Sequence, residues 1–220
     1  EETLPVTRVV DLLDYLLEER GSDLLVKVGS PPCIRRNGRL ERTTLDALDP
    51  ATIEELAAEL LPPDKAAEFK ANGETDLAHS VPGLGRFRVN VYRQRGSVSL
   101  AIRRVVRGAP AIADLGVPKV VADLAESRDG LVVISGPAAS GKTTTAAAMI
   151  DHINASQARH IVTIEDPIEV LHADRIAIIS QREVGADTTD VADAIRRASR
   201  QDADVIFASD LPDAASVREA

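Results

Sequence analysis

The segment 136–143 constrains the fold of this 220-residue chain more than any other part of it. It reads Gly-Pro-Ala-Ala-Ser-Gly-Lys-Thr and fits the pattern G-x-x-x-x-G-K-[ST]. Apolar residues at 131–134 precede it, and residues 144–154 follow it with the composition of a helix. A strand that enters a glycine-containing loop and continues as a helix is a unit of an α/β fold, which is the fold class we predict. The alternative is an ordinary Gly-Lys turn between a strand and a helix.

The residue types in this loop indicate what it would bind. Glycines let the backbone fold tightly, so that successive N–H groups point at phosphate oxygens while the helix presents its positive end to the same anion. Lys142 would reach the β- and γ-phosphates of ATP, and the Thr143 hydroxyl would be a ligand of Mg²⁺. The residues expected to bind the nucleotide are Gly136, Pro137, Ala138, Ala139, Ser140, Gly141, Lys142, Thr143 and Thr144.

Helices and strands alternate along the second half of the chain. We expect helices at 117–127, 142–154 and 189–200 and strands at 130–135, 160–165, 176–180 and 204–208. This order predicts a largely parallel sheet covered by helices. Gly108-Ala109-Pro110 interrupts the pattern, so we place a linker at 107–116 and the second domain at 117–220.

Residues 1–106 are interpreted as a separate α+β domain. Apolar residues recur at helical spacing from Val9 to Leu17, with Gly21 as the expected stop. Asp49 is placed to cap a second helix, and a third helix ends near Gly73. Strands are expected at 22–28, in a hairpin at 34–40 around Asn37-Gly38, and at 75–81, 85–93 and 97–106.

Two apolar strands end in acidic residues. Residues 161–164 lead into Glu165, and residues 205–208 lead into Ser209 and Asp210. In open α/β sheets the ligand lies at the carboxyl ends of the strands, where a carboxylate can activate a water molecule or act on Mg²⁺. An acidic residue on a solvated loop after a buried strand is the alternative for each of them.

Charge and hydropathy narrow the class of partner. The net charge is −9, which argues against nucleic acid or an anionic membrane as the main partner. No window approaches about 18 consecutive apolar residues, and the N-terminus lacks a signal-peptide pattern. We therefore expect a cytoplasmic protein with no nucleic-acid partner and no direct membrane insertion.

Four stretches of the sequence carry a family resemblance. They are Gly21-Ser22-Asp23-Leu24 with Gly29 to Arg35 and Gly38, Arg86 to Gly96, Thr163 to Glu169 with Gln181 to Gly185, and Asp193 to Ile206. From about residue 7 onwards, the chain resembles the pilus-retraction motor ATPases of the type IV pilus and type II secretion superfamily. The Gly-Ser-Pro-Pro opening at 29–32 and the Gln-Arg-Glu-Val-Gly segment at 181–185 favour the retraction branch over the extension and secretion branches.

The resemblance implies a PAS-like α+β N-terminal domain, a RecA-like P-loop NTPase domain that is incomplete at its C-terminus, and a homo-hexamer. Hydrolysis of ATP with Mg²⁺ would power type IV pilus retraction and twitching motility through an inner-membrane pilus platform protein, beside which the motor would lie. By position, Glu165 would be the general base, Asp210 the Walker B acid acting on Mg²⁺, and Arg88 and Arg103 would reach the γ-phosphate. Without the resemblance, the two arginines are better explained as strand residues that solvate a sheet edge.

The chain departs from the family in four places. Ala138-Ala139 stand where the family usually has Thr-Gly, Ser209-Asp210 replaces Gly-Glu, and Pro212 replaces an arginine. The fourth departure is that the sequence is expected to end before the family's histidine box. Ala139 lacks the freedom of glycine to adopt a positive φ, and the carboxylate of Asp210 is one methylene shorter. A nucleotide-binding regulatory or structural subunit with weak or no hydrolysis is therefore the rival interpretation, beside an extension or secretion ATPase.

Overall fold

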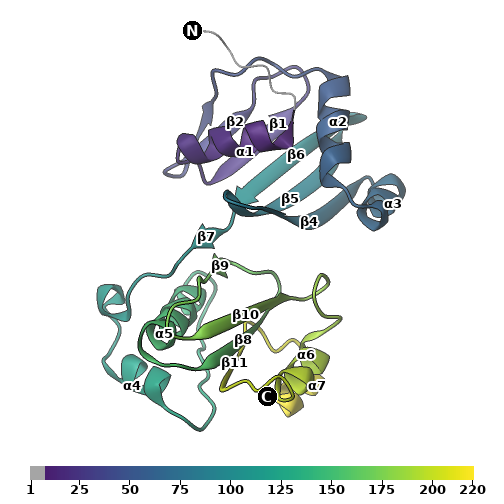
Figure 1. The fold of residues 1–220 in the computed structure, drawn as a ribbon. Helices are drawn as coiled ribbons and strands as arrows, with labels where there is room; N and C mark the ends of the chain where they lie inside the picture. The colour runs from purple at the N-terminus through teal and green to yellow at the C-terminus, as the bar shows by residue number, and fades with distance from the viewer. Residues whose placement is uncertain (1–7) are drawn as a thin grey trace. The chain divides into compact units, whose positions relative to one another are not determined.

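The computed structural model describes residues 8–220, so the first seven residues of the expected domain at 1–106 lie outside the described part. The chain divides into two compact units, and the boundary falls between Val105 and Val106 (Figure 1). Unit 1 is α+β and unit 2 is α/β. Each unit is described by itself below.

Unit 1 is built on a six-stranded sheet in which all neighbouring strands are antiparallel. The strand order is β3-β2-β1-β6-β5-β4. The strands are β1 (Asp23–Lys27), β2 (Cys33–Arg36), β3 (Arg39–Arg42), β4 (Glu74–Val81), β5 (Gly85–Gln94) and β6 (Ser97–Arg104).

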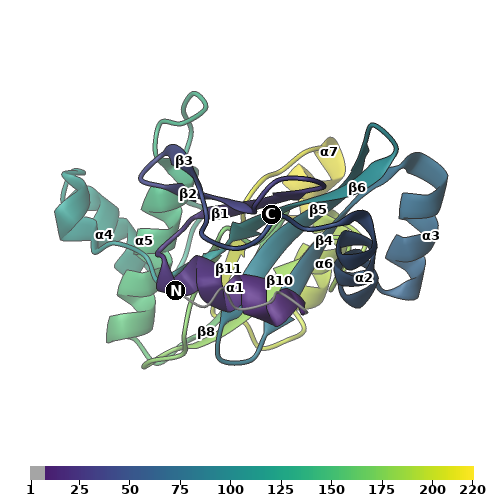
Figure 2. The same cartoon turned by 90° about the horizontal axis from the view of Figure 1, so that it is seen from above.

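Three helices belong to this unit, namely α1 (Val9–Glu18), α2 (Pro50–Leu60) and α3 (Pro63–Asn72). The apolar side chains of α1 and α2 pack with every second residue of the strands, and α1 and α2 lie on the same side of the sheet (Figures 1 and 2). Buried members of this core are Leu12, Leu16, Leu24, Ile34, Ile53, Phe87 and Leu100. Because strand side chains alternate between faces, polar residues such as Asp23 and Lys27 point to the opposite face.

Local signals for turns and caps act in unit 1 as expected, with one correction. Asn37 and Gly38 adopt φ angles of 50° and 80° between β2 and β3, and the carboxylate of Asp49 accepts a 2.8 Å hydrogen bond from the Thr52 N–H. Arg20, not Gly21, takes the left-handed conformation after α1, with φ of 53°. Gly21 is needed for space instead, because a Cβ there would lie 2.5 Å from Cδ1 of the buried Leu16.

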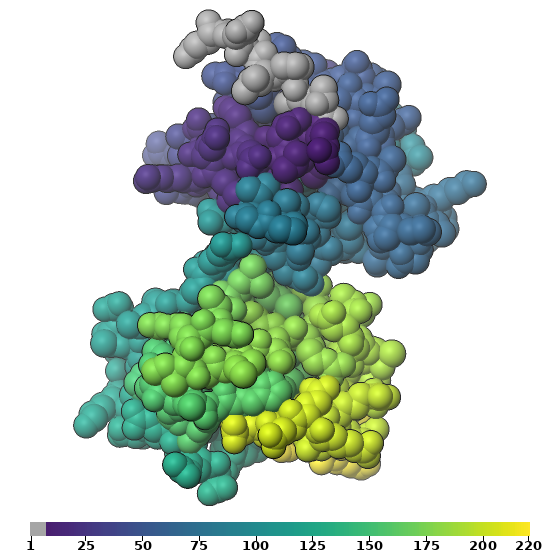
Figure 3. All heavy atoms as spheres, viewed as in Figure 1, coloured from purple at the N-terminus to yellow at the C-terminus, as the bar shows by residue number. Residues whose placement is uncertain are grey.

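Unit 2 is built around a parallel sheet with the order β10-β8-β11. Its strands are β8 (His160–Glu165), β10 (Ile178–Glu183) and β11 (Val205–Ala208), and a separate parallel pair joins β7 (Val106–Arg107) to β9 (Val170–Leu171). Its helices are α4 (Val120–Glu126), α5 (Lys142–Ser156), α6 (Val191–Ala198) and α7 (Ala214–Glu219), preceded by the 3-10 turn η1 (Ile112–Leu115). Figure 3 shows α7, in yellow, at the surface of this unit.

Two apolar clusters cover the two faces of this sheet. Ile161 packs with Ile150 and Ile153 of α5, whereas Ile164 packs with Ala194 and Ile195 of α6. An odd and an even position of one strand point to opposite faces, so β8 lies between two helical layers. The expected parallel, helix-covered sheet is thus present.

The expected strand at 130–135 is wrong. These residues form no strand, and the side chains of Leu131 and Val133 are 69% and 71% exposed. A strand needs a neighbour to satisfy its backbone hydrogen bonds, and no described strand pairs with this segment. The expected strand at 176–180 begins and ends later, as β10, and therefore includes Gln181 and Glu183.

Within the described residues, no helix is both long enough and apolar enough to cross a bilayer.

Candidate functional site

The loop at 136–141 adopts a tightly turned backbone. Gly141 has φ of 91°, and Ala139, a residue with a Cβ, also takes a left-handed φ of 61°. The Ser140 N–H donates to the carbonyl of Pro137 at 3.3 Å, which closes a turn. A Cβ at Gly136 would lie 2.8 Å from Oγ of Ser140, so a larger residue at the start of the loop would displace the Ser140 hydroxyl.

Lys142 begins α5 and folds back over the loop. Its Nζ donates hydrogen bonds to the carbonyls of Gly136, at 3.0 Å, and Pro137, at 2.9 Å. The ammonium group therefore lies at the mouth of the turned loop without an acidic partner among the described residues. Thr143 and Thr144 follow it in the first turn of α5 and are exposed.

A loop of this form suits a phosphate group. Its exposed backbone precedes the N-terminus of a helix of 15 residues, whose dipole favours an anion. The ammonium of Lys142 adds a full positive charge, and the Thr143 hydroxyl offers the kind of oxygen ligand that Mg²⁺ takes. The residues present thus fit a nucleotide phosphate with its magnesium ion.

Glu165 is the last residue of β8 and is only 6% exposed. Its Oε1 accepts hydrogen bonds from Oγ1 of Thr163, at 2.7 Å, and from Nε2 of Gln181, at 3.0 Å. Burial raises the pKa of Glu165 above its ordinary value of 4.5, and these two hydrogen bonds oppose the rise. A buried carboxylate with a raised pKa is a stronger base than an exposed one.

Asp210 follows the neighbouring strand β11 and is exposed. Its Oδ1 accepts a 2.8 Å hydrogen bond from the N–H of Leu211. The adjoining Ser209 ties the two strand ends together, because its N–H donates to Ile164 O at 2.9 Å and its Oγ accepts from Asp166 N at 3.3 Å. The structure thus brings Glu165 and Asp210 to adjacent strand ends of the same parallel sheet.

Arg88 and Arg103 lie in unit 1, directly opposite each other on β5 and β6. The Nε of Arg103 donates a 2.7 Å hydrogen bond to Oδ1 of Asp23, and Arg35 lies 3.8 Å from the other oxygen of the same carboxylate. Arg88 is exposed and has no ion pair among the described residues. The two arginines therefore form one basic pair on the sheet face that lacks helices within unit 1.

Thr163 and Gln181 were not among the predicted site residues. Thr163 is a buried polar residue in an otherwise apolar strand, two positions before Glu165, and this spacing places both side chains on one face. Gln181 lies in the Gln-Arg-Glu-Val-Gly segment, which the sequence marked only as part of a resemblance. Its contact with Glu165 depends on the pairing of β10 with β8.

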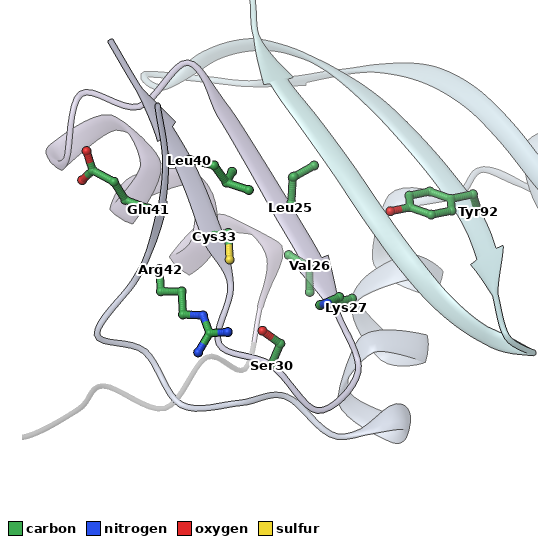
Figure 4. A pocket seen from close by; sticks show the side chains of 9 residues that line it. All are labelled: Leu25, Val26, Lys27, Ser30, Cys33, Leu40, Glu41, Arg42 and Tyr92. Carbon is green, nitrogen blue, oxygen red and sulfur yellow. The ribbon is translucent and has the colours of Figure 1, made fainter. Parts of the chain in front are cut away.

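Unit 1 also carries a hollow of about 360 Å³ near β1 to β3. Figure 4 shows the side chains that line it, which come from four strands and the turn after β1. They are Leu25, Val26, Lys27, Ser30, Cys33, Leu40, Glu41, Arg42 and Tyr92. None of them belongs to the predicted nucleotide-binding or catalytic residues.

Comparison with known proteins identifies relatives over most of the chain. The type IV pilus retraction ATPase PilT of Pseudomonas aeruginosa is 34% identical over 210 residues, which covers 96% of this chain and 61% of that protein. The type IV pilus ATPase PilU of the same organism is 36% identical over 200 residues, which covers 91% of this chain and 52% of PilU. This chain thus spans between half and two thirds of the length of these relatives.

Solved structures agree with this result. The crystal structure of the pilus retraction motor PilT with bound ADP matches with a TM-score of 0.86 and 38% identity, over 96% of this chain and 62% of that one. The Legionella pneumophila ATPase DotB shares the fold, with a TM-score of 0.73 at 24% identity. The family described as Type II/IV secretion system protein matches residues 90–219. The chain belongs to this family and is a PilT-like member of it.

Proposed function

We propose that this chain binds ATP with Mg²⁺ and hydrolyses it as a subunit of a hexameric motor that powers type IV pilus retraction. The observation that carries the proposal is the loop at 136–141, which turns tightly before α5. The ammonium of Lys142 donates hydrogen bonds to the carbonyls of Gly136 and Pro137 in this loop. Family membership supports an ATPase, and the similarity to PilT supports a pilus motor.

The proposed site residues bind the nucleotide, act on the magnesium ion or activate water. Lys142 binds the β- and γ-phosphates, the backbone of 136–141 holds the phosphate oxygens, and Thr143 and Thr144 supply hydroxyls from the first turn of α5. Thr143 and Asp210 act on the magnesium ion, which neutralises phosphate charge when it is bound. Glu165 accepts a proton from the attacking water, a role that suits its raised pKa.

The assembly is also part of the proposal. Residues 1–106 would be the PAS-like domain, 107–116 the linker and 117–220 part of the RecA-like ATPase core. Arg88 and Arg103 would contribute positive charge for recognition of the γ-phosphate, and their cross-strand pairing on β5 and β6 supports a joint role. The hexamer would act in the cytoplasm on an inner-membrane platform protein, since PilT and PilU are named as pilus ATPases.

Steady-state ATP turnover by the protein as its gene encodes it, compared with Lys142→Ala, tests this function. We expect turnover to fall by at least about a hundredfold in Lys142→Ala, because the phosphates lose their cation. Lys119→Ala, which removes an exposed lysine of the same unit, is the matched control and should keep wild-type turnover. Failure of the wild type to hydrolyse ATP would exclude the motor.

Two observations favour a second candidate, a nucleotide-binding regulatory or structural subunit. Ala139 takes a left-handed conformation that glycine adopts more readily, and Oδ1 of Asp210 is engaged by its own neighbour. Binding of ATP without turnover, lost in Lys142→Ala, would support this candidate. A pilus-retraction assay in cells would separate the retraction motor from an extension or secretion ATPase.

A further inference from the structure

Gln181 connects β10 to both the end of β8 and the segment that follows it. Its Nε2 donates to Oε1 of Glu165 at 3.0 Å and to the carbonyl of Val170 at 2.8 Å. Its Oε1 accepts a hydrogen bond from the N–H of His172 at 2.9 Å. Both amide hydrogens and the amide oxygen are thus engaged, which fixes the orientation of the side chain.

The register of the sheet explains why this residue reaches Glu165. Gln181 pairs with Thr163, and Glu183 pairs with Glu165, in the parallel ladder between β10 and β8. Side chains at 181 and 183 share one face because strand residues alternate. On that face the carboxylate of Glu183 accepts the Ile168 N–H at 3.0 Å, so β10 holds the segment 168–172 at several points.

Two donors converge on the same oxygen of Glu165. Thr163 donates from within β8 and Gln181 donates from β10. Because the carboxylate is buried, rotation about its terminal bonds would cost both hydrogen bonds without compensation from water. The carboxylate is therefore held in one orientation. The backbone N–H of Glu169 also donates to it, while the charge of the Glu169 side chain raises the pKa of Glu165.

We infer that Gln181 is a positioning residue for Glu165, whose amide fixes one carboxylate oxygen so that the other faces the water to be activated. The inference rests on the proposed hydrolytic function for its catalytic meaning. Gln181 itself has no contact with reacting atoms in this role. The first residue of the Gln-Arg-Glu-Val-Gly segment at 181–185 thus has a proposed role in orienting Glu165.

Three variants test whether Gln181 positions the carboxylate of Glu165 or only supports the segment 168–172. Gln181→Met keeps similar length and removes all three hydrogen bonds. Gln181→Glu keeps an acceptor for the His172 N–H but replaces the donor to Glu165 with a like charge. Glu183→Ala removes the acceptor of the Ile168 N–H and leaves the donors to Glu165 in place.

The first measurement is the pH profile of kcat for ATP hydrolysis by the whole protein. The acid limb of this profile is the pH range in which kcat falls as Glu165 becomes protonated. Because the loss of a donor to a buried carboxylate favours its protonated form, this limb should move to higher pH by about one unit in Gln181→Met. It should move further in Gln181→Glu, which adds a like charge. At neutral pH, kcat should fall about tenfold or more while KM for ATP changes little. The acid limb of Glu183→Ala should not move to higher pH, because the loss of a carboxylate opposite Glu165 removes a like charge and cannot raise the pKa of Glu165.

The second measurement does not need turnover. Infrared titration follows the protonated carboxyl band of Glu165, which is assigned by its loss in Glu165→Gln. The pKa read from this band should rise in Gln181→Met and should not rise in Glu183→Ala. A band that titrates as in the wild type in Gln181→Met would overturn the inference, even if activity were lost, because the loss would then be structural.

The two proposals can fail separately. If the titration of the Glu165 band shifts in Gln181→Met but the wild type does not hydrolyse ATP, the contact of Gln181 with Glu165 is supported and the proposed ATP hydrolysis is wrong. If the wild type hydrolyses ATP and Gln181→Met shifts neither the titration of the band nor the acid limb of kcat, the proposed ATPase activity is supported and the positioning role of Gln181 is wrong.

Discussion

The Thr163 hydroxyl donates a 2.7 Å hydrogen bond to Oε1 of Glu165, two residues further along β8. Thr163 has no solvent exposure, so its hydroxyl needs this internal acceptor. The bond stabilises the ionised carboxylate and opposes the effect of burial on the pKa of Glu165. The strand that carries the proposed base thus also supplies one of its hydrogen-bond donors.

Thr163→Val tests this contact because valine keeps the shape of threonine and lacks the hydroxyl. The pKa of Glu165 should rise, so the acid limb of kcat should move up by about one pH unit. The free energy of unfolding at pH 7 should fall by about 1 kcal/mol, which urea denaturation measures. Thr163→Ser keeps the donor and is the matched control, so an equal shift of its acid limb would contradict the role of the hydroxyl.

Glu165→Gln should change how stability depends on pH. The folded protein raises the pKa of Glu165 above 4.5, so the wild type binds more protons when folded than when unfolded over the interval between these two pKa values. Wild-type stability should therefore fall as pH rises through that interval, whereas glutamine does not titrate.

Thermal unfolding of both proteins across a range of pH tests whether wild-type stability falls, relative to Glu165→Gln, as pH rises. The melting temperature of Glu165→Gln relative to the wild type should increase from pH 4.5 upwards and become constant above the raised pKa. Glu55→Gln, a change at an exposed glutamate of unit 1, should leave the pH dependence close to that of the wild type. A constant difference at all pH values would show that Glu165 is not perturbed.

Features that depend on local chemistry could be predicted from the sequence. Asp49 caps α2 because its carboxylate reaches a free N–H three residues later, and Asn37-Gly38 turns the chain because both residues tolerate a positive φ. Glu165 falls at the end of β8 because an apolar run ends where the chain leaves the sheet. Each of these features involves only neighbours in the sequence.

Features that depend on a distant partner could not be predicted. Residues 130–135 have the composition of a strand, but backbone pairing decides whether a strand forms, and no described strand supplies it. Gln181 contacts Glu165 only because β10 pairs with β8 in one register, and the predicted strand at 176–180 ended before that residue. The position of Asp23 between Arg103 and Arg35 likewise follows from the order of three strands.

Asp23→Asn should weaken unit 1 at neutral pH. Burial raises the pKa of Asp23, but hydrogen bonds from Ser22 and Arg103, with the charges of Arg103 and Arg35, outweigh it and hold the pKa below 3.8. A carboxylate with a lowered pKa stabilises the folded state above its unfolded value, and this contribution is lost as pH falls through the folded pKa.

Urea denaturation should show that Asp23→Asn lowers the free energy of unfolding by about 1 kcal/mol at pH 7, since charge-assisted hydrogen bonds are lost. The difference from the wild type should shrink as pH falls below 3.8. Asp46→Asn, at an exposed aspartate of the same unit, should change stability by less than about 0.5 kcal/mol. An Asp23→Asn difference that persisted in acid would point to packing rather than charge.

Ala139→Gly and Ala138→Gly form a matched pair within the loop at 136–141. Ala139 has φ of 61°, a conformation that costs an L-residue about 1–2 kcal/mol and glycine almost nothing, whereas Ala138 has no positive φ. Either change adds about 0.4–1 kcal/mol of unfolded-state entropy. Ala139→Gly should therefore leave the free energy of unfolding equal or raise it by up to about 1.5 kcal/mol, while Ala138→Gly should lower it by about 0.5–1 kcal/mol.

Urea denaturation of the two variants measures this difference directly. Equal losses in both would contradict the left-handed conformation of Ala139. A gain confined to Ala139→Gly would show that the folded loop holds Ala139 in a backbone conformation that alanine disfavours. The glycine usual in the family at this position would then be explained by backbone conformation, and alanine would weaken the loop without removing any group that is proposed to bind phosphate.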